Sequence, residues 1–142
     1  IEKETQLRSE RARVAGVFIN RLKQDMPLQA DCCVSYGLYQ KDSRPLNQAL
    51  SRQELKIPHP FNTYLNKGLP PAPICNPGKA SLEAAANPQK TDELFYVADG
   101  TGGHVFSKNS QQHQHNHKQW RKIRKRIKAA QKQKSIFPLK NK

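Results

Sequence analysis

The first 23 residues carry a helical pattern of hydrophobic positions. One face of the pattern follows the spacing i, i+3, i+4 and i+8, and consists of Val14, Val17, Phe18 and Leu22. This spacing places the four side chains on one stripe of a helix, with most of the charged residues elsewhere. We therefore predict a helix over Ile1–Lys23.

The next region carries weaker signals. The segment Leu28–Leu38 is short and mixed in polarity, and it is compatible with an extended piece or a short helix. Ser51 is followed three residues later by Glu54, which is the spacing of a capping box and predicts a short helical turn.

The segment Pro58–Pro77 contains six prolines. Since each proline lacks a backbone N–H, no helix or strand is expected there. Ordered loops of this length are uncommon and usually functional. Several apolar side chains are interleaved and could anchor a rigid loop, namely Phe61, Tyr64, Leu65, Leu69 and Ile74.

The remaining elements follow in order. Lys79–Ala86 is Ala-rich and predicts a helix, and Leu94–Phe106 reads as a hairpin around the Gly-rich turn 99–103. A helix near the C-terminus is indicated by apolar residues at helical spacing, namely Trp120, Ile123 and Ile127. The predicted fold class is α+β.

Charge is distributed unevenly along the 142 residues. The net charge is +14, but 11 of the 25 Lys and Arg residues fall in Lys118–Lys142, which has no Asp or Glu. We therefore expect two parts, a body of residues 1–117 and a basic helix or tail of residues 118–142. The tail is compatible with a solvated helix end, with attraction to an anionic envelope or membrane surface, or with nucleic-acid binding, although nucleic acid is not the expected partner.

Cysteine and histidine residues give little evidence for a disulfide framework or a metal site. We interpret Cys32, Cys33 and Cys75 as small hydrophobic residues. The alternatives are a disulfide bridge from Cys75 to Cys32 or Cys33, and a metal site. The alternating residues 113, 115 and 117 are all His and suit a polar loop better than a metal site. The sequence shows neither a membrane-spanning run nor a signal peptide, and it begins at Ile1 without Met, so we expect a piece of a longer protein.

A set of motifs resembles the YceG-like endolytic murein transglycosylases over roughly residues 1–120. Ile1-Glu-Lys-Glu-Thr5 is similar to the family's I-E-K-E, and Val17-Phe-Ile-Asn-Arg-Leu22 to its V-F-x-N-R-L. Further matches follow in the same order: Leu28-Gln-Ala-Asp31 with Tyr36-Gly37, Asn62-Thr-Tyr64, Gly68-Leu-Pro-Pro71, Asn76-Pro-Gly78, and the hairpin from Phe95 to Phe106. The chain departs from the family pattern at Cys32-Cys33, where Pro-Thr is usual, and at Phe61, where Tyr is usual.

The resemblance implies an enzyme that cleaves the β-1,4 bond between N-acetylmuramic acid and N-acetylglucosamine within glycan strands. The muramyl 6-hydroxyl attacks its own anomeric carbon, so one carboxyl group serves first as acid and then as base. That group must be protonated near neutral pH, which requires an apolar pocket. The family motif places this role on Glu4, with Glu2 as second choice. On a helix these two side chains would point about 200° apart, so that one alone faces a cleft.

Further roles follow from the same resemblance. Side chains that could bind sugar or peptide-stem groups are Asn20, Gln29, Asp31, Asn62, Thr63 and Tyr64. No metal and no organic cofactor is implied. Expected partners are peptidoglycan glycan strands and the synthases that make them, and the chain is expected to be a monomer. The full-length protein would carry a single membrane anchor and act on the extracytoplasmic side of the bacterial cytoplasmic membrane. The alternative function is a non-catalytic peptidoglycan-binding or scaffold module.

Overall fold

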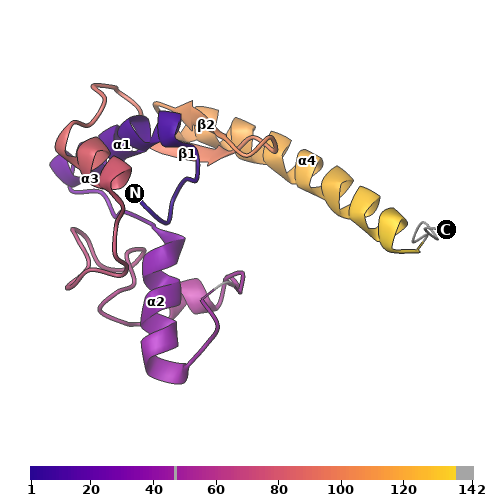
Figure 1. Cartoon of the computed structure of the whole chain (residues 1–142), viewed down its shortest axis with the longest axis horizontal. Helices are drawn as coiled ribbons and strands as arrows, with labels where there is room; N and C mark the ends of the chain where they lie inside the picture. Colours follow the sequence, from indigo (N-terminus) through magenta and orange to yellow (C-terminus); the bar gives the residue numbers. More distant parts are fainter. Residues whose placement is uncertain (47, 137–142) are drawn as a thin grey trace. The chain divides into compact units, whose positions relative to one another are not determined.

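The structure, a computed structural model, describes residues 1–46 and 48–136. The chain divides into two compact units, Ile1–Leu94 and Phe95–Lys142. The described residues form four α-helices and a two-stranded antiparallel sheet, which confirms the α+β class (Figure 1). The expected boundary between residues 117 and 118 lies inside a continuous helix, so it marks a change of charge rather than the end of an element. Residues 137–142 of the expected basic segment lie outside the described residues.

The first helix is shorter than predicted. Helix α1 spans Arg11–Lys23 and is preceded by a 3₁₀ turn at Arg8–Glu10, while Ile1–Leu7 is not helical. The predicted stripe is right, because Val14 and Val17 are fully buried. The prediction of helix over Ile1–Leu7 is wrong.

Contacts with distant residues explain why the helix does not extend to Ile1. The Glu2 carboxylate accepts hydrogen bonds from the Ser81 hydroxyl at 2.7 Å and from the Gly78 N–H at 3.0 Å. The Thr5 side chain is buried, and its hydroxyl accepts a hydrogen bond from the Leu7 N–H. Such local and tertiary bonds compete with helical hydrogen bonds for the same backbone groups. The N-terminal segment is therefore held by residues that the local pattern does not contain.

Helix α2 spans Asp31–Asp42, which decides between the two alternatives for this region in favour of a helix. It ends at Ser43 in a left-handed conformation. A Cβ atom at Gly37 would lie 2.5 Å from His59 Nδ1, so the absence of a side chain there lets the proline-rich segment pack directly on α2. The Phe61 ring lies 5.1 Å from the Tyr36 ring in this contact.

The proline-rich segment contains no helix or strand, as predicted, and polar side chains hold much of it. The amide of Asn62 donates to the carbonyls of Leu55 and Ile57, and the Thr63 hydroxyl accepts from the Ala30 N–H at 2.9 Å. Both side chains are at most 2% exposed. Of the apolar anchors predicted here only Phe61 is buried, whereas Leu65 and Leu69 are exposed. The capping box before this segment is confirmed, since Ser51 and Glu54 exchange side-chain to backbone bonds at the start of the 3₁₀ turn Glu54–Lys56.

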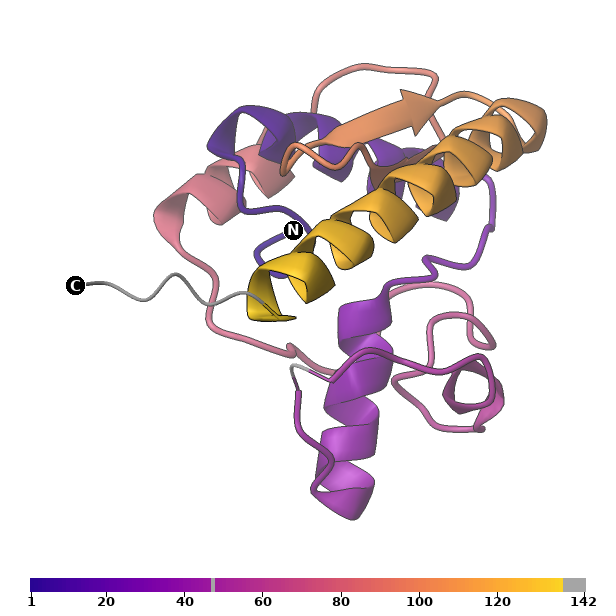
Figure 2. The same ribbon diagram turned by 90° about the vertical axis from the view of Figure 1, so that its right-hand side faces the viewer.

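Helix α3 spans Lys79–Ala86, as predicted, and lies beside α1 (Figures 1 and 2). The chain leaving α3 then crosses α1 at Gly16, where a Cβ atom would lie 2.3 Å from the Gln89 carbonyl oxygen. Residues 89–94 lie along α1 and are held there by hydrogen bonds from polar side chains of that helix. Asn20 donates to the carbonyls of Thr91 and Glu93, and Arg13 pairs with the Glu93 carboxylate.

The second unit contains the predicted hairpin and one long helix. Strands β1 (Phe95–Ala98) and β2 (His104–Ser107) pair with Phe95 opposite Ser107. Asp99 organises the turn by accepting from the backbone N–H groups of Thr101 and Gly103.

Helix α4 spans Ser110–Ile136 and packs on both strands. The predicted C-terminal helix is confirmed, but it begins before the three histidines, so the expectation of a loop there is wrong. Asn109 explains the early start, because its side chain accepts the Gln112 N–H at 2.9 Å and caps the first turn. No helix in the described part of the chain combines the length and the hydropathy needed to cross a membrane.

Candidate active site

A cavity of about 460 Å³ lies within the unit Ile1–Leu94. Its wall is formed by the N-terminal turn, α1, the beginning of α2, the proline-rich segment and α3. Most of the lining is apolar and includes Phe18, Ile19, Leu22, Leu28, Pro70 and Ile74. Two carboxylates also line it, those of Glu2 and Glu4. The cavity therefore places two acidic side chains among mostly apolar neighbours.

Glu4 lies at the end of a tight turn before α1. Its N–H donates to the Ile1 carbonyl at 3.1 Å, which closes the turn. Its side chain is half-buried, and Oε1 accepts a hydrogen bond from the Cys32 thiol, with Sγ and Oε1 3.0 Å apart. This places the carboxyl group against the first turn of α2, inside the cavity.

Glu2 lines the same cavity in a different environment. Its carboxylate accepts from Ser81 and Gly78 at the beginning of α3, and Arg11 lies 3.5 Å away. The hydrogen bond from the Ser81 hydroxyl, then the one from the Gly78 N–H, and the Arg11 charge hold the pKa of Glu2 below its ordinary value. A carboxyl group with a lowered pKa is a poor proton donor near neutral pH.

The expectation that one glutamate faces the cleft and the other faces away is wrong. It assumes helical geometry, and residues 2–4 form a turn instead. Both side chains reach the cavity, and their hydrogen-bond partners distinguish them. Sequence reasoning misses Ser81, because a serine in the first turn of a helix carries no signal that a distant carboxylate binds it.

The sequence profile of the YceG-like family matches residues 1–119. The chain belongs to the YceG-like family.

Named relatives and a solved structure agree with this membership. An endolytic murein transglycosylase of Bacillus subtilis is 43% identical over 113 residues, which are 80% of this chain and 30% of that protein. One of Streptococcus pneumoniae is 38% identical over 117 residues, covering 79% of this chain and 20% of that protein. A crystal structure of a yceG-like protein from Listeria monocytogenes aligns with a TM-score of 0.72 and 41% identity, over 80% of this chain and 36% of that one. The chain thus spans about a fifth to a third of the length of these family members.

Three of the predicted substrate-binding side chains in this YceG-like chain are engaged by the chain itself. Asn20 bonds to the carbonyls of residues 91 and 93, Asn62 to those of residues 55 and 57, and Thr63 to the backbone of Ala30. None of the three lines the cavity. Their contacts explain how the cavity walls are held, and their assignment to substrate binding stays a prediction.

The other three predicted residues belong to the same unit, in which Gln29 and Asp31 are exposed and Tyr64 is half-buried. The Tyr64 hydroxyl donates to Asp31 Oδ1 at 2.5 Å. Burial of the Tyr64 hydroxyl, followed by its bond to Asp31, raises the pKa of Tyr64 above its ordinary value. Gln29 has an exposed side chain and a left-handed backbone, with its N–H bonded to the Thr63 carbonyl. Gln29 precedes α2, and Asp31, the partner of Tyr64, is its first residue. The next residue, Cys32, contacts Glu4.

The cysteines are all free thiols, and all three line the cavity. The sequence marks Cys32-Cys33 only as a departure from the family motif. The structure adds the contact of Cys32 with Glu4, which links this departure to the candidate catalytic group.

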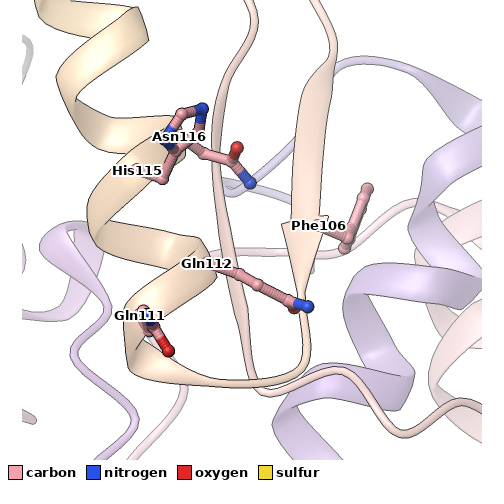
Figure 3. A pocket seen from close by; sticks show the side chains of 5 residues that line it. All are labelled: Phe106, Gln111, Gln112, His115 and Asn116. Atoms are coloured by element: carbon pink, nitrogen blue, oxygen red, sulfur yellow. The ribbon is translucent and has the colours of Figure 1, made fainter.

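The histidines of the second unit do not gather into a metal site. No cluster of three or more His, Cys, Asp or Glu side chains suited to a metal ion occurs within residues 1–46 and 48–136. The His113 ring stacks on Phe95 with centroids 5.0 Å apart. His115 lines a shallow groove between β2 and α4, in which Gln112 and Asn116 point toward the strand while Phe106 points away from the helix (Figure 3).

Proposed function

We propose that this chain is the catalytic part of an endolytic peptidoglycan lytic transglycosylase. It cleaves the β-1,4 bond from N-acetylmuramic acid to N-acetylglucosamine within nascent strands and leaves 1,6-anhydromuramyl ends. In this role it terminates glycan elongation. The observation that carries the proposal is the Glu4 carboxyl group in a largely apolar cavity, in a chain whose relatives are named endolytic murein transglycosylases.

The two cavity carboxylates support a division of roles. Glu4 accepts a hydrogen bond from the Cys32 thiol, whereas Glu2 is bound by a hydroxyl, a backbone N–H and a nearby guanidinium. Because these partners favour the ionised form of Glu2, that residue serves to anchor the N-terminal turn. We therefore assign the proton exchange to Glu4, the residue that the family motif marks.

The reaction needs a single carboxyl group that first donates a proton and then accepts another. The Glu4 carboxylic acid donates its proton to the glycosidic oxygen, and the bond from the muramyl anomeric carbon to that oxygen breaks. The Glu4 carboxylate next accepts the proton of the muramyl 6-hydroxyl, whose oxygen bonds to the anomeric carbon. Since the nucleophile belongs to the sugar, no second carboxylate is required to position water, unlike in ordinary glycosidases.

Polar groups beside the cavity supply candidates for substrate contact. The Asp31–Tyr64 pair and the exposed Gln29 amide lie where a strand could reach them from the surface. The Asp31 carboxylate could also stabilise positive charge that develops on the sugar ring. Asn20, Asn62 and Thr63 act by holding the framework and bind substrate only if their internal hydrogen bonds open.

We also propose that the basic face of α4 is attracted to the anionic envelope surface. Within the described side chains, positions 118–131 hold seven Lys or Arg residues and no acidic residue. Trp120 and Ile123 lie close to Gly100 of the hairpin turn, so the helix packs its apolar stripe on the hairpin and leaves its charges exposed. Such a surface suits a catalytic region that works on the extracytoplasmic side of the membrane, near the synthases that extend glycan strands.

The deciding experiment is product analysis by mass on purified glycan strands. The wild-type chain should yield anhydromuramyl ends, and Glu4→Gln should lower the rate by about 10²–10⁴-fold, the contribution of general acid–base catalysis. Glu83→Gln, an exposed change on α3, serves as the matched control and should retain the wild-type rate. Circular dichroism establishes that each variant is folded.

Other outcomes point to other functions. Reducing ends in place of anhydro ends would mean a hydrolase that uses water. Glycan pull-down that survives Glu4→Gln, with no product from the folded wild-type chain at any concentration, would mean a non-catalytic binding module.

A further inference from the structure

We propose that Cys32 is a positioning residue, which holds the Glu4 carboxyl group in the cavity by donating its S–H to Oε1. This inference rests on the proposed function of Glu4. It concerns a position where the sequence departs from the family motif, so it describes a feature of this chain.

The geometry joins two segments that are far apart in sequence. Glu4 lies in the N-terminal turn and Cys32 is the second residue of α2, with Sγ and Oε1 3.0 Å apart. Both residues line the same cavity and both are partly buried. A hydrogen bond in such surroundings is less weakened by water than one at the surface. The contact therefore fixes where the carboxyl group lies relative to α2.

The thiol is the donor in this contact. Its interaction with Cys33, its burial and the neighbouring Glu4 carboxylate all raise the pKa of Cys32, so the sulfur keeps its proton. A protonated thiol is a weak nucleophile and a weak hydrogen-bond donor. Cys32 thus fits a role in orienting the carboxyl group rather than a role in covalent chemistry.

A weak donor suits a carboxyl group that must alternate between two protonation states. Stronger donors would hold the group ionised, as the Ser81 hydroxyl, then the Gly78 N–H and the Arg11 guanidinium do for Glu2. A thiol restricts the position of the carboxyl group at a smaller cost to its neutral form.

The first test measures the contact without any activity. Iodoacetamide labelling of the folded 142-residue chain, followed by peptide mass spectrometry, gives the alkylation rate of each cysteine against pH. Replacing Glu4 by Gln removes the adjacent charge, so Cys32 should react about three- to tenfold faster at pH 8. Cys75 provides an internal comparison, since the change should not alter its rate. Glu83→Gln removes an exposed carboxylate that does not line the cavity, and it should leave the Cys32 rate within about twofold.

The second test measures the consequence for catalysis. Cys32→Ala should lower kcat by about tenfold, with KM changed by less than about twofold, because the lost contact orients the reacting group. The pH–activity profile should move to higher pH, since a bond that favours the carboxylate is lost. Cys32→Ser supplies a stronger hydroxyl donor, so it should restore part of kcat and move the pH–activity profile to lower pH than in Cys32→Ala. Cys75→Ala removes a thiol from the same wall without this bond and should leave the position of the pH profile unchanged.

The two tests separate the inference from the function on which it rests. Equal Cys32 alkylation in folded wild type and Glu4→Gln would overturn the contact, whatever the activity. A Cys32→Ala variant with wild-type kcat and an unmoved pH profile would overturn the positioning role. If alkylation responds to Glu4 but no glycan product forms, the proposed function fails while the contact itself stands.

Discussion

At the scale of single residues, the surroundings of Glu2 and Glu4 differ although the two residues are separated by one position. Glu2 bonds to the beginning of α3 and Glu4 to the beginning of α2. The turn that contains them is therefore held at both sides of the cavity. A carboxylate bound by Ser81 and Gly78 contributes to folding through its charged form, which makes that contribution dependent on pH.

We predict that Glu2→Gln destabilises the chain near neutral pH and not in acid. The folded-state pKa of Glu2 lies below its ordinary value of 4.5, mainly because Ser81 and Gly78 donate to it. The stabilisation is thus fully present above 4.5 and is lost as the pH falls through the lower, folded-state pKa. Urea denaturation should give a lower midpoint for the variant than for wild type at pH 7, and the gap should close in acid.

Glu83→Gln is the matched control for this measurement. Glu83 lies on the same helix, α3, in an exposed pair with Lys79 at 3.7 Å. Because exposed ion pairs contribute little to stability, the urea midpoint of Glu83→Gln should stay near that of wild type at every pH. If the urea midpoints of wild type and Glu2→Gln differed equally at neutral and acidic pH, the role assigned to the Glu2 charge would be contradicted.

At the scale of elements, close backbone approach determines how α1 meets the chain that leaves α3. The Gln89 N–H donates to the Ala12 carbonyl at 2.8 Å, and the Gln89 carbonyl lies over Gly16. Residues 89–94 then follow α1, and its Arg21 side chain donates to the carbonyls of Leu28 and Leu94. Polar side chains of α1 thereby satisfy backbone groups of an extended segment that belongs to no sheet.

We predict that Gly16→Ala destabilises the chain by about 1–3 kcal/mol, the usual cost of overpacking. Helix propensity alone predicts the opposite sign, a gain of about 1 kcal/mol for alanine. The new Cβ would meet the Gln89 carbonyl at 2.3 Å, and this atom is backbone that cannot rotate away. Thermal denaturation followed by circular dichroism measures the difference. A raised melting temperature would show that residues 89–94 do not lie against α1.

At the scale of the whole molecule, most of the excess of positive charge lies in one helix, α4. In the described part of α4, Lys and Arg occupy half of positions 118–131, while Ile123 and Trp120 face the hairpin. Charges spread over the rest of the chain are closer to balance. Attraction to an anionic surface should therefore depend on where a charge is removed, and not only on the change in net charge.

We predict that changing Lys122, Lys125 and Lys128 to Gln weakens binding to phosphatidylglycerol vesicles by about a hundredfold at low salt, since each basic residue near such a surface contributes roughly 1 kcal/mol. Vesicle co-sedimentation against salt concentration measures the effect. The matched control changes Lys41, Lys56 and Lys90, which are also exposed and lower the net charge equally. Equal losses for the two triple variants would mean that α4 is no specific binding face.

The sequence by itself determined the elements that depend on residues close together in the chain. Missing N–H donors in Pro58–Pro77 prevent regular structure, alanines form Lys79–Ala86, and the Gly-rich turn closes the hairpin. These inferences succeed because neighbours along the chain supply the decisive interactions.

The tertiary structure decided what depends on residues far apart in sequence. It made α1 begin at Arg11, brought Glu2 and Glu4 into one cavity, and set Cys32 beside Glu4. It also turned Asn62 and Thr63 into buried supports of the proline-rich segment. The physical reason is that a hydrogen bond to a group 28 or 79 positions away can outweigh helix propensity, and no local pattern reveals which group it will be.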